Sequence, residues 1–266
     1  MPKLSIITVN LNNKAGLIDT AQSVVAQTWT DYEWIIIDGG STDGSVEVIK
    51  EYADKTEKLI YWCSEPDDGI YQGMNKGIEK ASGEYCWFLN SGDYAYKNTT
   101  LAEVFANKFD EDIVSGDVFF KFGHNDLRLH KYLRNIKNGK IPEYFWFGKS
   151  LPHQSTFIKK ECFDKYGKYK TDIGSSADWV FWVDRIVVDN VSYKRIFNKV
   201  AVFIVGNNFG VMHTKRRKEY LKSVFKKKYI FLFIKHILFN EWKSVILSNK
   251  LVNKMYTTIK YGKWKE

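Results

Sequence analysis

Cysteine is scarce in this sequence of 266 residues. The three cysteines, Cys63, Cys86 and Cys162, are far apart and odd in number. Such spacing provides neither the disulfide framework of a small secreted domain nor the CxxC pair of a zinc site. We therefore expect the chain to work in a reducing compartment.

Proline and long apolar runs are also scarce. The chain has 4 Pro and 18 Gly beside 44% hydrophobic residues, which excludes collagen-like, low-complexity and disordered chains. The first apolar stretch, residues 4–11, is interrupted by Asn10 and is too short for the apolar region of a signal peptide. These features predict a cytoplasmic globular protein. Its length suits one large α/β domain, or a domain of about 200 residues with an appendage.

Excess positive charge is missing from most of the chain. The formal net charge is +9, but residues 213–266 hold 15 Lys and Arg against 3 Asp and Glu, which gives +12 and leaves −3 for residues 1–212. A mildly acidic body with a basic arm is not the pattern of a nucleic-acid-binding protein, so we expect no nucleic-acid partner. The charge distribution predicts a domain over residues 1–212 and a basic arm over residues 213–266. It does not indicate an oligomeric state.

Short apolar runs alternate with segments of helical spacing along the body. This βαβα order predicts an α/β fold with a Rossmann-like, mainly parallel sheet flanked by helices, and ligands bind such sheets at the carboxyl ends of the strands. For residues 122–150 the sequence indicates only a loop or a small antiparallel excursion of the chain. The expected strands are residues 4–9, 32–38, 59–64, 85–89, 113–120, 154–159 and 200–205, and the expected helices are 16–27, 45–52, 70–81, 98–108 and 177–188.

Four polar clusters stand where predicted strands end. Their carboxylates and amides suit the base and ribose of a nucleotide, and the helix N-termini that follow suit its phosphates. Neither a GxGxxG nor a GxxxxGK[ST] pattern occurs, which disfavours ordinary dinucleotide and P-loop sites. The clusters are residues 10–13 (NLNN), 38–44 (DGGSTDG), 65–69 (EPDDG) and 90–93 (NSGD).

These clusters, together with residues 74–77 (MNKG) and 83–85 (GEY), resemble the family 2 glycosyltransferases over residues 3–212. More narrowly they are similar to the bacterial exopolysaccharide and colanic-acid type. The resemblance implies a GT-A fold, and the pattern of the basic arm adds a helical C-terminal extension to it. It also implies an inverting transfer of one sugar from a nucleotide-diphosphate sugar, UDP by default, to a glycan or lipid-linked acceptor in surface polysaccharide biosynthesis.

The resemblance also assigns the donor site. Asp43 is better explained as a carboxylate at the start of a helix, where it stabilises the helix dipole. The residues expected to line the nucleoside are Thr8, Asn10 and Asp38, those expected near the base or ribose are Glu65 and Asp67, and Asn75 is expected near the diphosphate.

A divalent cation is expected beside the diphosphate. Residues 90–93 stand where the family carries its DxD carboxylates, with Ser91 in place of the first Asp and Asp93 kept. Mn²⁺ or Mg²⁺ neutralises a leaving diphosphate with one or two protein carboxylates. His213 resembles a C-terminal histidine that contacts this metal, or is a surface residue at the start of the arm. The incomplete motif also leaves a catalytically inactive, donor-binding partner subunit as an alternative.

The general base is expected at Asp178. Its place before Trp179 matches the family's base position, and an inverting transfer needs one carboxylate to accept the proton of the acceptor hydroxyl. A second, compatible interpretation makes Asp178 the N-cap of the helix that follows. His153, with Trp179, is expected near the sugar or acceptor, and a structural role for His153 is equally consistent with the sequence.

The basic arm contains an apolar stripe over residues 230–245. Lys235 and His236 interrupt it, so it is too short to span a bilayer. A basic amphipathic helix suits the surface of an anionic membrane, which places the protein on the inner face of the cytoplasmic membrane beside a lipid-linked acceptor. Packing of the stripe on the catalytic domain is the alternative. The stripe consists of Ile230, Ile234, Ile237, Leu238, Trp242 and Val245.

Overall fold

The computed structural model describes residues 1–123, 126–130, 136, 140–205 and 214–234. The chain divides into two compact units. The first comprises residues 1–141 and 150–213, and the second comprises residues 142–149 and 214–266. The first contains the sheet and every candidate site residue that the structure describes.

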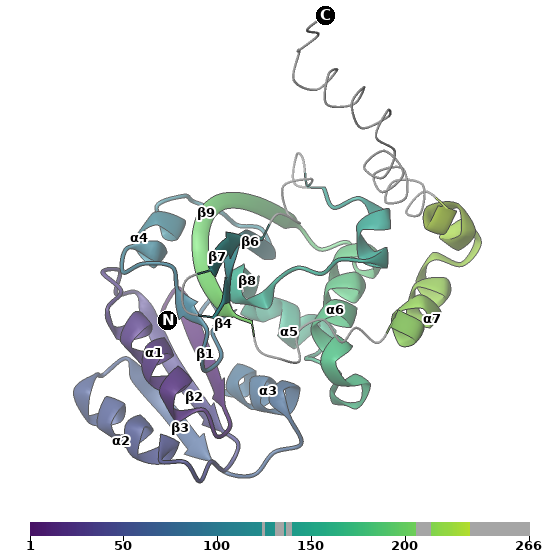
Figure 1. Ribbon diagram of the computed structural model, residues 1–266. Helices are drawn as coiled ribbons and strands as arrows, with labels where there is room; N and C mark the ends of the chain where they lie inside the picture. The colour runs from purple at the N-terminus through teal and green to yellow at the C-terminus, as the bar shows by residue number, and fades with distance from the viewer. Residues whose placement is uncertain (124–125, 131–135, 137–139, 206–213, 235–266) are drawn as a thin grey trace, which may run out of the picture. The chain divides into compact units, whose positions relative to one another are not determined.

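The first half of this unit alternates strictly between strands and helices (Figure 1). Four parallel strands lie in the order β3-β2-β1-β4, which confirms the parallel sheet predicted for this half. Two strands, β2 and β3, have the predicted bounds. The elements are β1 (Leu4–Asn10), α1 (Lys14–Val25), β2 (Tyr32–Asp38), α2 (Ser45–Lys55), β3 (Leu59–Ser64), α3 (Ile70–Lys80) and β4 (Tyr85–Phe88).

The two faces of this half-sheet are covered by different helices. Leu4 and Ile6 belong to the core cluster that includes residues of α1 and α2. Ile7 points to the opposite face, under α3, where a Cβ on Gly77 would lie 2.4 Å from the Ile7 Cγ2 atom. Figure 1 shows α1 and α2 on one side of the strands and α3 on the other. Glycine at position 77 therefore allows α3 to approach the sheet closely.

The second half of the sheet is mixed. Within the described residues the full order is β3-β2-β1-β4-β8-β6-β9-β5, and β7 pairs with β6. The β8 strand runs antiparallel to both β4 and β6, whereas β6 and β9 are parallel. The later elements are β5 (Tyr94–Ala95), α4 (Thr100–Phe105), β6 (Ile113–Phe122), β7 (Asp126–Leu129), β8 (Thr156–Lys159), α5 (Lys160–Tyr166), α6 (Ala177–Trp182) and β9 (Tyr193–Ile204).

Several predicted elements differ in their bounds, and two differ in secondary-structure type over part of their length. Residues 153–155 form a 3₁₀ turn rather than the start of a strand, because the Ser155 N–H and the Thr156 hydroxyl both donate to the Pro152 carbonyl. The predicted helix 177–188 ends its α-helical part at Trp182 and continues as a π-helix, Val183–Val188. The antiparallel excursion expected in residues 122–150 is confirmed in its first part, where β7 pairs with β6.

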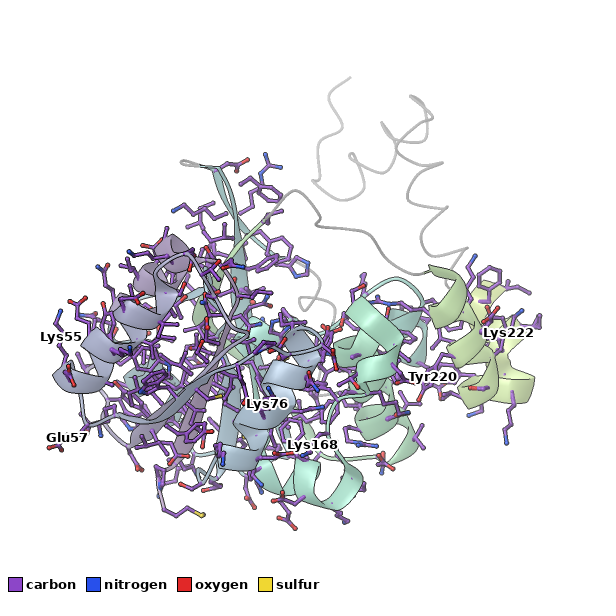
Figure 2. All side chains as sticks on the ribbon, turned by 90° about the horizontal axis from the view of Figure 1, so that it is seen from below. Lys55, Glu57, Lys76, Lys168, Tyr220 and Lys222 are labelled. Atoms are coloured by element: carbon purple, nitrogen blue, oxygen red, sulfur yellow. The ribbon has the colours of Figure 1, made fainter. Side chains whose placement is uncertain are left out.

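The second unit contains α7 (Thr214–Phe225), a 3₁₀ turn at Lys226–Lys228 and helical residues 229–234. Tyr229 lies near Lys222, and Phe233 near Lys218, so the chain turns back along α7. The Phe147 ring lies 5.4 Å from the Tyr229 ring, between centroids. Lys222 projects from α7 in Figure 2. Across the described ranges, no helix has the length and apolar character needed to cross a membrane.

Candidate active site

A buried carboxylate ties together the ends of β1, β2 and β3. The Asn10 Nδ2 atom donates to Asp38 Oδ1 at 2.7 Å, and the hydroxyls of Ser41 and Ser64 donate to the same carboxylate, each at 2.6 Å. Burial raises the pKa of Asp38, but the hydrogen bonds from Ser41, Ser64 and Asn10 outweigh it and hold the pKa below its ordinary value. Asp38 is therefore an ionised anchor for the loops that follow these strands.

Thr8 and Asn10, both on β1, differ in whether they have a polar atom free to bind a ligand. Thr8 is fully buried, and its hydroxyl accepts a hydrogen bond of 3.0 Å from the Trp34 indole. The structure thus places Thr8 in the core, where it presents no surface to a nucleoside. Asn10 is 1% exposed, and its Oδ1 atom has no hydrogen-bond partner.

Asp43 has the structural role that the sequence indicates. Its Oδ1 atom accepts from the backbone N–H and the hydroxyl of Ser45, the first residue of α2, and its Oδ2 atom accepts from the Lys14 N–H at 2.7 Å. Hydrogen bonding to Ser45 is the main reason that the pKa of Asp43 lies below its ordinary value. The carboxylate therefore stabilises the start of a helix, as expected.

The loop between β3 and α3 presents two carboxylates. Glu65 is exposed and pairs with Lys76 of α3 at 2.8 Å; Lys76 is labelled in Figure 2. The hydrogen bond to Lys76 lowers the pKa of Glu65. The Asp67 Oδ1 atom accepts the Gly69 N–H at 3.0 Å. Both side chains lie in one loop, and their contact with a base or ribose stays a prediction.

Asn75 is engaged in packing rather than directed at a ligand. Its Nδ2 atom donates to the Tyr169 carbonyl at 2.8 Å, and its Oδ1 atom accepts the Tyr169 N–H at 3.0 Å. The Tyr169 ring in turn lies 4.9 Å from the Phe181 ring of α6. Asn75 therefore helps to position α6, and both of its polar groups already bind backbone instead of a diphosphate.

A cleft of about 510 Å³ opens beside the end of β4. It is lined by residues 90–93, by Asn13 and Gly16 at the start of α1, and by His153 and Gln154. The Asn13 side chain donates to the Ser91 carbonyl at 3.0 Å and so joins the turn after β4 to α1. The cleft lies at the carboxyl ends of parallel strands, as the topology predicts.

Asp93 is a buried acid at this cleft. It is 5% exposed, and burial raises the pKa of its carboxyl to about 7, against the opposing effects of the nearby His153 and of hydrogen bonds from Gln154 and the Ile204 backbone. Close to neutral pH this group is balanced between its charged and uncharged forms. A cation at the cleft would favour the carboxylate.

The turn after β4 fits a hard divalent cation. In the part of the chain that the structure describes, no three His, Cys, Asp or Glu side chains gather around a common point. Mg²⁺ and Mn²⁺ need only one or two protein carboxylates, since phosphates and water complete their shell. Asp93 provides one carboxylate, and Asn90 adds a buried Oδ1 atom without a hydrogen-bond partner. His213, expected as a further ligand, lies outside the described residues.

Asp178 faces His153, one of the residues that line the cleft. It is the second residue of α6, whose N-cap is Ser176, so the structure excludes the interpretation of Asp178 as N-cap. The Asp178 Oδ1 atom accepts the Trp179 N–H at 2.6 Å, and Oδ2 lies 3.7 Å from Nδ1 of His153. The Nε2 atom of His153 lies 3.3 Å from Nδ2 of Asn90. A carboxylate is thus linked through one imidazole to the turn after β4.

Some residues differ from their expected roles or were not foreseen. Trp179 is fully buried, so the structure makes it a core residue with no surface for a sugar. Ser41, Ser64 and Asn90 bind candidate site residues but were not predicted individually. Their signal was their place within or next to the polar clusters at strand ends.

Comparisons with known proteins agree with this geometry. A family model described as Glycosyl transferase family 2 matches residues 5–167. A PGL/p-HBAD biosynthesis glycosyltransferase of Mycobacterium bovis is 28% identical over 253 residues, covering 92% of this chain and 93% of the relative. An uncharacterized glycosyltransferase of Mycobacterium tuberculosis is 36% identical over 185 residues, covering 68% and 67% of the two chains.

Solved structures share the fold. The S. aureus protein TarS, residues 1–349 in complex with UDP-GlcNAc, aligns with a TM-score of 0.69 at 14% identity, covering 89% of this chain and 72% of TarS. The mannosyltransferase PcManGT of Pyrobaculum calidifontis, in complex with GDP-Man and Mn²⁺, aligns with a TM-score of 0.60 at 18% identity, covering 89% and 70%.

The fold and site define a glycosyltransferase of the GT-A type. The chain belongs to glycosyl transferase family 2.

Proposed function

We propose that the protein transfers one sugar from a UDP-sugar to a hydroxyl group of its acceptor, with inversion at the anomeric carbon and with Asp178 as the general base. One observation carries this proposal: a carboxylate with 16% side-chain exposure meets His153, which lines the cleft beside the carboxyl ends of the parallel strands. A carboxylate next to a residue of the cleft supports the role of a base that accepts a proton from an incoming hydroxyl.

The chemistry requires a single displacement. The acceptor oxygen loses its proton to Asp178 and attacks the anomeric carbon as the bond from that carbon to the nucleoside diphosphate breaks. Attack from the face opposite the leaving group inverts the anomeric configuration. A bound cation held by Asp93 and Asn90 would neutralise the charge that develops on the diphosphate.

The site dimensions and the comparisons support a nucleotide-sugar donor. A cleft of about 510 Å³ lies within the range of small-molecule sites, about 300–1,000 Å³. The related folds were solved with UDP-GlcNAc and with GDP-Man. UDP is our choice of nucleotide for this chain.

We also propose a glycan or lipid-linked acceptor in surface polysaccharide biosynthesis, used at an anionic membrane surface. Residues 214–234 contain eight Lys and Arg and one Glu. Ile230 and Phe231 are 66% and 69% exposed, whereas Tyr229 and Leu232 are buried. One set of apolar side chains thus packs within the second unit and another faces outward beside the lysines, an arrangement that suits the interface of an anionic bilayer.

An activity assay tests the proposal. The protein is incubated with a panel of nucleotide sugars, Mn²⁺ and lipid-linked or soluble glycan acceptors, and the anomeric configuration of the product is read by NMR. Inverted product that is lost in Asp178→Asn, while donor binding remains, supports the assignment. A retained configuration, or near-normal turnover in that variant, overturns it. Donor binding with neither transfer nor hydrolysis would instead identify an inactive partner subunit.

A further inference from the structure

Asp178 has one oxygen fixed by its own helix and one oxygen directed at a histidine. Oδ1 accepts the Trp179 N–H at 2.6 Å, and Oδ2 lies 3.7 Å from the His153 Nδ1 atom. Both side chains are largely buried, with 16% and 15% exposure for Asp178 and His153. The carboxylate of the candidate base is therefore oriented between two nitrogen atoms.

One placement of the ring hydrogen fits both contacts of His153. An ionised carboxylate only accepts hydrogen bonds, so a hydrogen bond between His153 and Asp178 requires the hydrogen to be on Nδ1. In neutral histidine Nε2 is then an acceptor, and the Asn90 Nδ2 atom is positioned to donate to it at 3.3 Å. The same orientation of the Asn90 amide leaves its Oδ1 atom without a hydrogen-bond partner. A neutral ring with its hydrogen on Nδ1 is thus compatible with both contacts.

We infer that His153 is the positioning residue for Asp178, with its Nδ1–H directed at the carboxylate by the hydrogen bond that Asn90 donates to Nε2. His153 then acts through Asp178 and does not bind the donor itself. Catalytic hydrogen bonds are often long before substrate binds, and the 3.7 Å separation fits that behaviour. This inference rests on the proposed function, because it assumes that Asp178 is the base.

Two substitutions separate the links of His153. In His153→Asn the amide nitrogen takes the place of Nδ1 and keeps a donor toward Asp178. In His153→Gln the amide takes the place of Nε2, which keeps a partner for Asn90 and loses the link to Asp178. Since misplacement by about 1 Å costs about 10²-fold, we expect kcat to fall about 10²-fold in His153→Gln and in His153→Ala. His153→Asn should restore most of that loss.

Donor affinity and a double variant complete the test. The affinity for UDP with Mn²⁺, measured by calorimetry, should be equal in His153→Asn and His153→Gln, so that donor binding does not explain their difference in kcat. In an Asp178→Asn background, His153→Ala should cause no further loss of kcat, because its effect passes through Asp178. Equal losses of kcat in His153→Asn and His153→Gln, a UDP affinity that is lower in His153→Gln than in His153→Asn, or an independent loss in the double variant would each overturn the inference. If Asp178→Asn alone retains turnover, the proposed base is wrong, which is a separate result.

Discussion

The Asn10 amide donates to the Asp38 carboxylate at 2.7 Å and thereby joins the end of β1 to the end of β2. Ser41 and Ser64 donate to the same carboxylate, so one fully buried charged group joins the ends of β1 and β3 to the loop after β2. Hydrogen bonds to a charged group are among the stronger ones in proteins. We therefore expect Asp38 to contribute to the stability of the protein.

Asp38→Ala should destabilise the protein, because it leaves the Asn10, Ser41 and Ser64 donors without their acceptor. We expect the free energy of unfolding to fall by about 2–4 kcal/mol at neutral pH. Urea unfolding measures this loss. The control is Asp54→Ala, which removes an exposed carboxylate of α2 and should change the free energy of unfolding by less than about 0.5 kcal/mol.

The same variant should show a pH dependence. Because the folded-state pKa of Asp38 lies below its ordinary value of 3.8, its stabilising contribution is present above that value and is lost as the pH falls through the folded-state pKa. The difference in the free energy of unfolding between the wild type and Asp38→Ala should therefore become smaller at acidic pH. A difference that stays constant between pH 7 and pH 3 would contradict the ionised anchor.

The parallel half of the sheet was predictable because its strands are continuous apolar runs that end in polar clusters. The strands at residues 32–38 and 59–64 have the predicted bounds for this reason. The mixed half was not, because β8 pairs with β4 and β6 through contacts between segments far apart in the chain. Local patterns carry no information about such pairings.

The candidate site, like the sheet, was predictable only in part. Its polar clusters were identified, but side-chain direction was not: Thr8 shares the core face of β1 with Leu4 and Ile6. The contact between Asn90 and His153 joins residues 63 apart in sequence, and no spacing rule predicts it.

Asp93 should make stability fall as the pH rises. Burial raises the pKa of its carboxyl from 3.8 to about 7. Between these values the folded state binds more protons than the unfolded state, so the free energy of unfolding decreases with pH. Asp93→Asn removes this titration and keeps the side-chain shape. With a chelator present, we compare the free energy of unfolding of Asp93→Asn with that of the wild type. The value for the variant minus the value for the wild type should be larger at pH 8 than at pH 5. The same difference at both pH values would be inconsistent with this assignment.

Asp93 should also carry the metal dependence of nucleotide binding. We expect Mn²⁺ to raise the affinity of the wild type for UDP, and Asp93→Ala to remove that increase while the fold remains intact, since the cation loses its one carboxylate from the turn after β4. Calorimetry with Mn²⁺ and with a chelator measures both affinities. Equal wild-type affinity under the two conditions would remove the cation from the mechanism.

Ile230 and Phe231 should mediate attachment to an anionic membrane. The wild type is expected to sediment with vesicles that contain anionic lipid, and to be released at high salt because screening weakens the attraction between lysine and lipid. The double variant Ile230→Asp/Phe231→Asp should lose binding, because charge replaces the apolar side chains that enter the interface. The matched control is Phe197→Asp, which changes a phenylalanine that is 79% exposed in the first unit.

The outcomes separate the two interpretations of this surface. If the outward side chains contact lipid, the double variant stays folded by circular dichroism, keeps its UDP affinity and its activity on a short soluble acceptor, and no longer sediments. Phe197→Asp should sediment like the wild type. If the double variant instead aggregates or unfolds, Ile230 and Phe231 are part of a protein core, and the membrane proposal is wrong. Undiminished sedimentation of a folded double variant would place the attachment at another surface.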